Sequence, residues 1–204
     1  MKIEMKIEMK IEMEVELAGE REFYTVEIAG LTRRLPLFEV APGVRIAVFN
    51  MLGDTTVVKA TAAVLSERIK QQAGGADVLV TAEAKSIPLI YELSALLGLP
   101  YIVLRKTYKP YMGAAISAET LSMTTGAPQQ LFLDEKDHAS IAGRKVILVD
   151  DVVSTGSTLT GMRSVITKAG ATAIATAAVF TEGNDDGWQD VIALANLPVF
   201  IDQK

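Results

Sequence analysis

Apolar and charged residues alternate strictly at the start of the chain. Residues 1–17, MKIEMKIEMKIEMEVEL, carry an apolar side chain at every odd position and a charge at every even one. A period of two is typical of a strand with one buried face. We therefore expect residues 1–20 to form a strand or arm that covers the domain or pairs across a dimer. A low-complexity extension is the alternative, since the MKIE repeat leaves the strand register ambiguous.

Short apolar segments follow and predict a small β region before the first helix. EFYTVEI (22–28) and LPLFEV (35–40) are brief, whereas VRIAVF (44–49) is a clearer strand. Asp54 is a good helix N-cap, and TTVVKATAAVLSERIKQQ (55–72) has helical periodicity up to Gly74-Gly75.

Continuous apolar runs then alternate with helical patterns. The predicted helices are residues 86–98 and 158–170. The predicted strands are residues 77–82, 101–106, 129–133, 145–150, 171–180 and 197–201. This alternation predicts an α/β fold with a mainly parallel sheet covered on both faces by helices. Ligands of such sheets bind beyond the carboxyl ends of the strands.

Composition narrows the classes of protein that remain. The 204 residues suffice for one α/β domain with a small appendage, and half of them are apolar. No cysteine is present, which excludes disulfides and thiolate metal sites and favours a reducing compartment. The only histidine, His138, lies in the polar stretch DEKDHAS and is expected at the surface, so a histidine-based zinc site is disfavoured.

Charge and hydropathy argue against two kinds of partner. The net charge of −5 opposes a DNA-binding role, which needs a basic surface. No apolar run approaches the roughly 20 residues needed to span a bilayer, and the N-terminus lacks the apolar core of a signal peptide. We expect a cytoplasmic protein without a membrane partner.

One stretch combines two carboxylates with a loop suited to an anion. In VILVDDVVSTGSTLTG (146–161), Asp150 and Asp151 are expected to close a buried strand, and a Ser/Thr/Gly run turns into a helix. Unpaired N–H groups at a helix N-terminus, with small hydroxyl side chains, can bind phosphate. Gly156 would allow close approach of the backbone.

The carboxylates need a different partner from the phosphate, which they would repel. Vicinal sugar hydroxyls fit, because an ionised carboxylate only accepts hydrogen bonds. The stretch therefore suggests a ribose 5-phosphate. An N-cap with a solvated turn is the ordinary alternative. A receiver-type acidic pocket is less consistent, since it needs a further Asp and a Lys at successive strand ends.

The stretch resembles the phosphoribosyl-pyrophosphate signature of the type I phosphoribosyltransferases at every position of the motif. The similarity extends over roughly residues 35–201 and is closest to the adenine and xanthine enzymes and the purine-repressor effector domain. The resemblance implies a type I phosphoribosyltransferase fold in a single domain, residues 21–204. It would comprise a small N-terminal hood of about residues 21–50 and a core of about residues 51–204, with residues 1–20 as an extra β segment.

The resemblance also assigns roles to the signature. Asp150 and Asp151 would be the catalytic pair that orients the ribose hydroxyls and stabilises developing positive charge. The loop would hold the 5-phosphate and comprises Val153, Ser154, Thr155, Gly156, Ser157 and Thr158.

Two further segments are similar to the family's pyrophosphate site. TAEAKSIPL (81–89) follows a strand and opens a helix, so the Ala84 backbone, Lys85 and Ser86 would bind pyrophosphate. YIVLRKTYKPYM (101–112) begins the family's lid and adds three candidate cations. These are Arg105, Lys106 and Lys109. An ordinary turn and solvated surface charge are the respective alternatives.

The resemblance implies a reaction, a metal ion and a class of base. Ribose 5-phosphate would pass from phosphoribosyl pyrophosphate to a purine, releasing pyrophosphate, with Mg²⁺ held mainly through substrate and water rather than by dedicated protein ligands. Ser154 replaces an acid of the 6-oxopurine enzymes, which favours adenine first and xanthine next. The lid glutamate of adenine enzymes has Glu119 as a doubtful counterpart, because alignment places Thr124 there.

Other features of the resemblance leave alternatives open. The hood over the base should come from residues 35–50, and Trp188 is expected to pack rather than stack on a base. A non-catalytic sensor of phosphoribosyl pyrophosphate is the second functional hypothesis, and a structural dimerisation domain is a weaker third. A homodimer is expected from the family.

Overall fold

A five-stranded parallel sheet forms the centre of the computed structural model, which describes residues 22–121, 128–183 and 185–202. Its strand order is β10-β9-β8-β4-β5. The strands are β4 (Val78–Ala82), β5 (Tyr101–Leu104), β8 (Lys145–Val153), β9 (Thr172–Glu182) and β10 (Val191–Leu197). All neighbouring pairs are parallel, as the alternation of strands and helices predicts.

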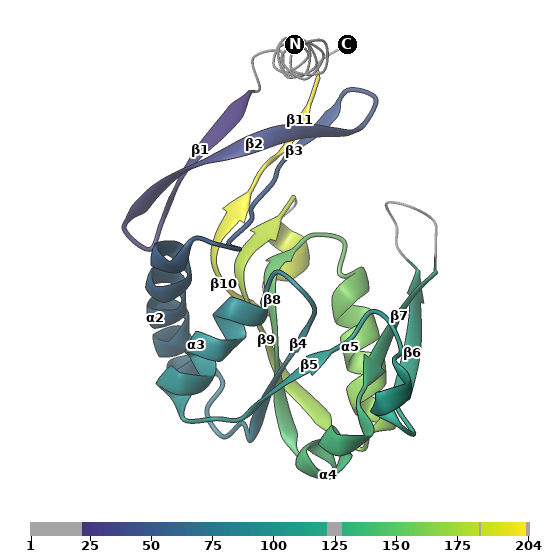
Figure 1. Cartoon of the computed structure of the whole chain (residues 1–204). Coiled ribbons are helices and arrows are strands. Elements are labelled where there is room, and N and C mark those ends of the chain that lie inside the picture. Colours follow the sequence, from purple (N-terminus) through teal and green to yellow (C-terminus); the bar gives the residue numbers. More distant parts are fainter. Residues whose placement is uncertain (1–21, 122–127, 184, 203–204) are drawn as a thin grey trace, which may run out of the picture.

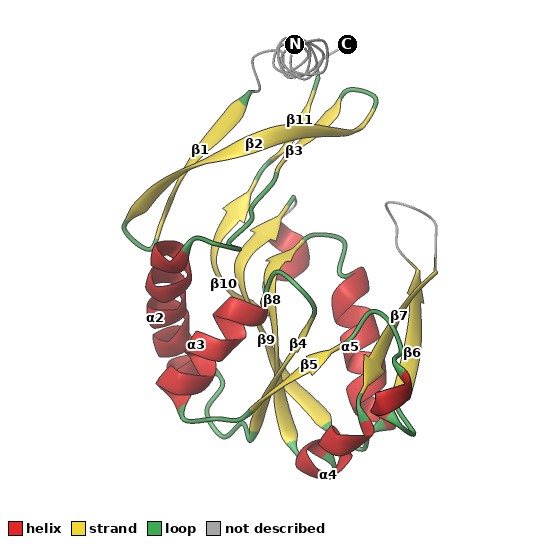
Figure 2. Cartoon of the chain, viewed as in Figure 1, coloured by secondary structure: helices red, strands yellow, loops and turns green. Residues whose placement is uncertain are grey.

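Helices cover both faces of this sheet (Figures 1 and 2). Helices α2 (Thr55–Gln72) and α3 (Ile87–Leu97) lie on one face. Helix α5 (Ser157–Lys168) lies on the other, together with the antiparallel hairpin of β6 (Ile116–Leu121) and β7 (Pro128–Leu133). The predicted fold class, a parallel sheet with helices on both faces, is confirmed.

The strands are apolar on both faces because both faces are buried. Leu79 and Ile147 pack under α2 and α3, while their neighbours Val80 and Leu148 pack under α5. All four side chains are fully buried. This explains why the strands read as continuous apolar runs rather than as alternating ones.

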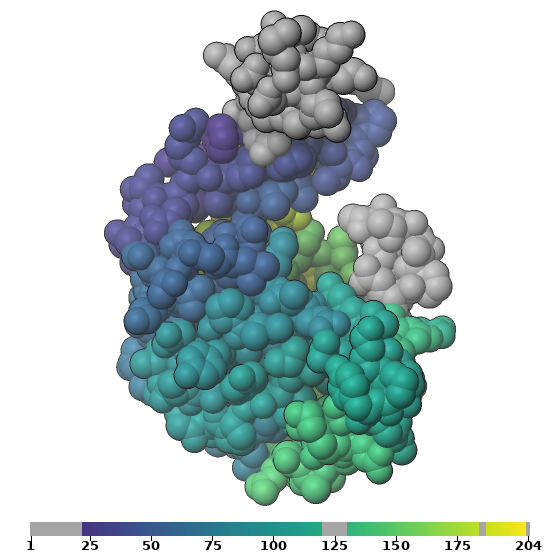
Figure 3. Space-filling view, viewed as in Figure 1, coloured from purple at the N-terminus to yellow at the C-terminus, as the bar shows by residue number. Residues whose placement is uncertain are grey.

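A second, antiparallel sheet rises from one end of the core (Figure 1). We call it the hood. Its strand order is β1 (Phe23–Ile28), β2 (Leu31–Ala41), β3 (Val44–Ala47) and β11 (Val199–Ile201). The strand β11 pairs with β3, so the hood draws on both ends of the described chain. The molecular surface is hollowed between the hood and the core on the side of the β6–β7 hairpin (Figure 3).

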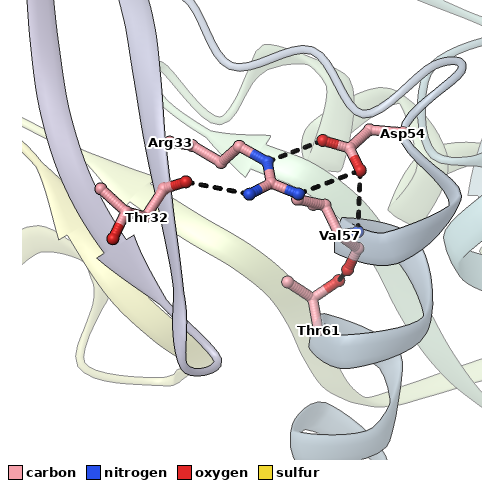
Figure 4. A network of polar contacts seen from close by, with 5 residues as sticks. All are labelled: Thr32, Arg33, Asp54, Val57 and Thr61. Carbon is pink, nitrogen blue, oxygen red and sulfur yellow. Dashed lines mark hydrogen bonds and ion pairs between the residues drawn. The ribbon is translucent and has the colours of Figure 1, made fainter.

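An ion pair ties the hood to the core (Figure 4). Asp54 caps α2 by accepting from the Val57 amide at 3.0 Å. Its carboxylate also accepts two hydrogen bonds from the Arg33 guanidinium of β2, at 2.7 and 3.2 Å. The hydrogen bond from Arg33 is the largest cause that holds the pKa of Asp54 below its ordinary value. The predicted cap therefore also anchors the hood hairpin.

Most core elements lie where the sequence pattern predicts them. The helix over 55–72 is confirmed at both ends, and Gly98 ends α3 in the left-handed conformation at φ 67°. The strand ending at Asp150 was predicted too short, because β9 runs on beside β8 and supplies partners up to Val153. The MKIE segment, residues 1–20, lies outside the described residues.

Three strand assignments need correction. The sheet ends with β10, which the sequence analysis passed over because its alanines and asparagine weaken the apolar pattern. The segment predicted at 197–201 forms β11 in the hood instead. The polar region after Thr107 contains the unpredicted strand β6, which is stabilised by pairing with β7 rather than by an apolar run.

Short helical turns complete the described chain. They are η1 (Pro110–Met112), η2 (Glu135–Asp137), α4 (His138–Ile141) and η3 (Asp185–Trp188). Within the described ranges, none of the helices combines the length and the apolar character needed to cross a bilayer.

Candidate active site

The two aspartates of the signature lie at the carboxyl end of the parallel sheet, within the last residues of β8. The adjacent strand β4 ends at Ala82, so the loop after β4 lies beside them. Asp151 is only 8% exposed and Asp150 is half-buried. The sheet therefore presents two neighbouring carboxylates at the edge where ligands of parallel sheets bind.

Ser86 holds the two aspartates together. Its buried hydroxyl donates to Asp150 Oδ1 at 2.9 Å and accepts from the Asp151 amide at 3.1 Å. The Asp151 amide also donates to Asp150 Oδ1 at 2.9 Å. The Ser86 side chain, expected at pyrophosphate, is thus engaged with the carboxylates and precedes α3.

Burial and the charge of its neighbour change the acidity of Asp150. Burial, followed by the charge of Asp151, raises the pKa of Asp150 from its ordinary value of 3.8 to about 7. Near neutral pH the free pair therefore holds a proton part of the time. A group that neutralises the carboxylates, or donates hydrogen bonds to them, would favour the doubly ionised form.

The loop after β8 forms a small cavity of about 80 Å³ that opens beside Asp150. Its other lining residues are Val152, Val153, Ser154, Thr155, Gly156, Ser157, Thr158 and Leu159. Gly156 has a positive φ of 75° and immediately precedes α5. The structure thus brings the six residues predicted for the 5-phosphate together at the N-terminus of a twelve-residue helix.

Trp188 packs against this loop. A Cβ atom added to Gly156 would lie 2.6 Å from Cη2 of Trp188. The indole is half-buried and packs against the α5 side of the core. This agrees with the prediction that Trp188 packs rather than stacks on a base, and it adds the loop glycine as its contact.

A second cavity, of about 200 Å³, brings two lysines beside the same aspartates. Its lining residues are Ala82, Glu83, Ala84, Lys85, Ser86, Lys106, Asp150, Asp151, Val152 and Thr158. The Glu83–Ala84 peptide bond in this loop is cis. Four of the six residues predicted for pyrophosphate therefore meet here: Ala84, Lys85, Ser86 and Lys106.

The other predicted cations lie elsewhere. Arg105 pairs with Glu83, whose hydrogen bond and charge raise the pKa of the guanidinium, and it lines a neighbouring cavity of about 460 Å³. Lys109 is exposed just before η1 and lines none of these cavities.

The doubtful lid acid, Glu119, also lies away from the aspartates. It is exposed on β6 and accepts from the Gln130 side chain of β7 at 2.7 Å. It lines neither cavity beside Asp150. The alternative position, Thr124, lies outside the described residues.

A third cavity beside the aspartates, of about 280 Å³, lies between the hood and the signature loop. We call it the hood-side cavity. It is lined by Ile46, Ala47, Val48, Phe49, Lys85, Asp151, Val152, Ser154, Thr155 and Glu182. Residues 46–49 fall within the 35–50 segment expected to cover the base.

Glu182 is a site residue that the sequence analysis missed. It is the last residue of β9 and only 8% exposed. An acid directly following the buried run ATAIATAAVFT, at a carboxyl strand end, was the signal that could have found it.

The donor groups here suit a cation held through ligand and water. Among the described residues no group of three or more His, Cys, Asp and Glu is placed to bind a metal ion by itself. Asp150 and Asp151 offer hard carboxylate oxygens, which fit Mg²⁺ in a shared shell with phosphate oxygens and water. The single histidine, His138, opens α4 and is half-buried.

With this geometry described, the chain can be assigned to a family. The model of the phosphoribosyl transferase domain family matches residues 50–193, and the chain belongs to this family. Its fold is the type I phosphoribosyltransferase fold.

The curated relatives include purine phosphoribosyltransferases of two kinds. An adenine phosphoribosyltransferase of Mycolicibacterium gilvum is 33% identical over 150 residues, which are 71% of this chain and 76% of the relative. A hypoxanthine/guanine phosphoribosyltransferase of Methanocaldococcus jannaschii is 36% identical over 97 residues, about half of each chain. These matches support the prediction of a pentosyltransferase of the adenine phosphoribosyltransferase type.

A regulator and a solved structure complete the comparison. The purine biosynthesis transcriptional activator PurR of Lactococcus lactis is 26% identical over 77% of this chain, but the match spans only 55% of that regulator. The crystal structure of adenine phosphoribosyltransferase from Thermoanaerobacter pseudethanolicus superposes with a TM-score of 0.59 at 17% identity, covering 85% of this chain and 95% of that one. At this identity the likeness speaks for the fold alone.

Proposed function

We propose that the protein transfers ribose 5-phosphate from phosphoribosyl pyrophosphate to a purine base, with adenine as the preferred base, and releases pyrophosphate. The observation that carries this proposal is the meeting of three cavities at Asp150 and Asp151. One is lined by the signature loop, one by lysines and one by the hood. Their number matches the phosphate, pyrophosphate and base of such a reaction, and two lysines line the cavity that we assign to pyrophosphate.

The carboxylates would act on the sugar. Ionised Asp150 and Asp151 accept hydrogen bonds from the ribose hydroxyls, which fixes the anomeric carbon between the pyrophosphate and the base. As the bond to pyrophosphate breaks, positive charge develops on the ribose ring, and the fixed carboxylates stabilise it. Ser86, through its hydrogen bonds, keeps the Asp150 carboxylate and the Asp151 backbone in place.

The remaining groups would hold the two ends of the substrate. The amides and hydroxyls of residues 153–158 bind the 5-phosphate at the start of α5. Lys85 and Lys106 bind the pyrophosphate and favour its departure. When bound, Mg²⁺ would supply further neutralisation of pyrophosphate charge at the carboxylates and the lysine-lined cavity.

The preference for adenine rests on two supports. Ser154 stands where the 6-oxopurine enzymes of the family carry an acid. The Mycolicibacterium gilvum relative, which covers most of this chain, is an adenine phosphoribosyltransferase. We further propose a homodimer, which the family resemblance implies, and a reducing, cytoplasmic environment, which the lack of cysteine supports.

A sensor of phosphoribosyl pyrophosphate is the second candidate. The similarity to PurR over 77% of this chain favours it. A sensor would bind phosphoribosyl pyrophosphate in the same loop without turning it over.

Pyrophosphate release separates the two functions. Phosphoribosyl pyrophosphate and Mg²⁺ are supplied with adenine, xanthine, guanine, hypoxanthine, uracil or orotate, and the wild type is compared with the double variant Asp150→Asn/Asp151→Asn. We expect release that depends on adenine and falls at least 100-fold in the variant. Binding of phosphoribosyl pyrophosphate by calorimetry, with no release for any base, would leave the sensor.

A further inference from the structure

Glu182 places a buried carboxylate in the wall of the hood-side cavity. Within the described part of the chain, the only hydrogen bond that this carboxylate accepts comes from the Ser154 hydroxyl. The carboxylate forms no ion pair with any described cation. A carboxylate offers about four acceptor positions on two oxygens. Glu182 therefore retains acceptor capacity that no described protein group uses.

Burial makes unused capacity costly. A side chain that is more than nine-tenths buried has given up most of its contact with water, so few water molecules can fill its remaining acceptor positions. Such a group is retained where a ligand completes its hydrogen bonds. Its surroundings show what shape that ligand has.

The cavity around Glu182 combines apolar walls with the polar residues Lys85, Asp151, Ser154 and Thr155, a lining that suits a flat ring with polar edges. Ile46, Ala47 and Phe49 supply apolar surface from the hood side, and Val152 supplies it from the core side. Phe49 is itself fixed by edge-on packing against Phe180 of β9, with ring centroids 4.9 Å apart. Walls of this kind accept the faces of a ring, while a carboxylate recognises a donor on its edge.

We propose that Glu182 is the specificity-determining residue for the base and accepts a hydrogen bond from the exocyclic 6-amino group of adenine. This inference rests on the proposed function, whose base site it defines. Hypoxanthine and xanthine carry a carbonyl oxygen at position 6, which the carboxylate repels. A site built around such an acceptor rejects analogues without the donor.

The variant Glu182→Gln tests this assignment, because an amide of nearly the same shape both donates and accepts. We expect the KM for adenine to rise at least tenfold, while the KM for phosphoribosyl pyrophosphate changes less than twofold. The ratio of kcat/KM for adenine to that for hypoxanthine should fall at least 100-fold. Glu182→Asp, which keeps the charge, should retain the preference for adenine.

Two controls separate recognition from a structural role. Ser154→Ala removes the hydrogen bond to Glu182 but keeps the carboxylate, so it should preserve the preference among bases even if it weakens phosphoribosyl pyrophosphate binding. Glu67→Gln makes the same chemical change on the exposed surface of α2. Thermal melting of each variant establishes that it is folded.

The outcomes also separate this inference from the proposed function. The role of Glu182 would be overturned, and the transferase function left intact, by either of two results. One is an adenine KM for Glu182→Gln within twofold of wild type, and the other is a fall in kcat/KM confined to guanine. If wild type releases no pyrophosphate with any base, adenine binding is measured by calorimetry with ribose 5-phosphate, pyrophosphate and Mg²⁺ present. If adenine binding then weakens tenfold in Glu182→Gln, the result supports the role of Glu182 in base recognition but not the transferase function. Absence of adenine binding to the wild type overturns both claims.

Discussion

At the residue scale, the position of the aspartate pair costs folding stability. A protein stabilised for folding alone would not place a buried and a half-buried carboxylate side by side, with no described cation paired to either. The raised pKa of Asp150 expresses the cost. Its environment is arranged for a ligand that brings hydroxyl donors and positive charge.

This cost predicts how stability depends on pH. Because the pKa of Asp150 is higher in the folded chain, about 7, than the ordinary 3.8, the folded protein holds an extra proton between these values. The free energy of unfolding should therefore fall as the pH rises from about 4 to about 7, and be flat above that. Asp150→Asn removes this loss and should be more stable than wild type at pH 8 by about 2 to 4 kcal/mol, and by much less at pH 4.

Urea unfolding of the ligand-free protein at both pH values measures the effect. Glu67→Gln, an exposed carboxylate on α2, serves as the control and should change the free energy of unfolding by less than about 0.5 kcal/mol. A variant Asp150→Asn no more stable than wild type at pH 8 would show that the carboxylate is not destabilised in the folded chain.

At the scale of elements, the loop between β8 and α5 depends on a contact from another part of the chain. Gly156 has φ 75°, and Trp188 of η3 lies directly against it. The indole therefore limits how the loop amides can move. An added methyl group must displace either the ring or the backbone that forms the phosphate cavity.

Gly156→Ala is accordingly expected to weaken ribose 5-phosphate binding at least tenfold by calorimetry. Gly143→Ala is the matched control, since Gly143 has a similar φ of 72° but nothing lies within 4 Å of an added Cβ. It should cost about 1 kcal/mol of stability and leave binding unchanged. Since Trp188 is the only tryptophan, its fluorescence should also change on ligand binding in wild type. Equal binding losses in both variants would mean that backbone strain, not the indole contact, is responsible.

The sequence predicted the parts of the fold that local pattern controls. The core strands, α2 with its Asp54 cap and the signature loop all follow from apolar runs, capping residues and glycine, which act over a few neighbours. β6 and β11 were missed or misplaced because partners distant in sequence define them. Glu182 was missed for the same reason, since its importance appears only once β9 and the hood enclose one cavity.

At the scale of the whole molecule, the two ends of the described chain together form the hood. β11 forms the edge of the hood by pairing with β3. Phe200 packs edge-on against Tyr24, with ring centroids 5.5 Å apart. Asp202 forms an ion pair with Arg45, with Oδ1 and Nη2 2.9 Å apart. The parallel sheet, by contrast, ends with β10 at Leu197. The hood, which we propose to cover the base, is therefore built from β11 and the N-terminal strands together, while the loop that we propose to bind the 5-phosphate belongs to the core.

Removal of residues 198–204 separates these two sides. The cut leaves every strand of the parallel sheet but exposes the edge of β3, so the hood should loosen while the core stays folded. Hydrogen exchange in residues 22–47 should accelerate, and the KM for the base should rise at least fivefold. Binding of ribose 5-phosphate should stay within twofold of wild type, because its loop joins β8 to α5 in the core. Removal of residues 203–204 alone is the control and should change none of these. An unchanged base KM in the longer truncation, with faster exchange in the hood, would show that the hood does not form the base site.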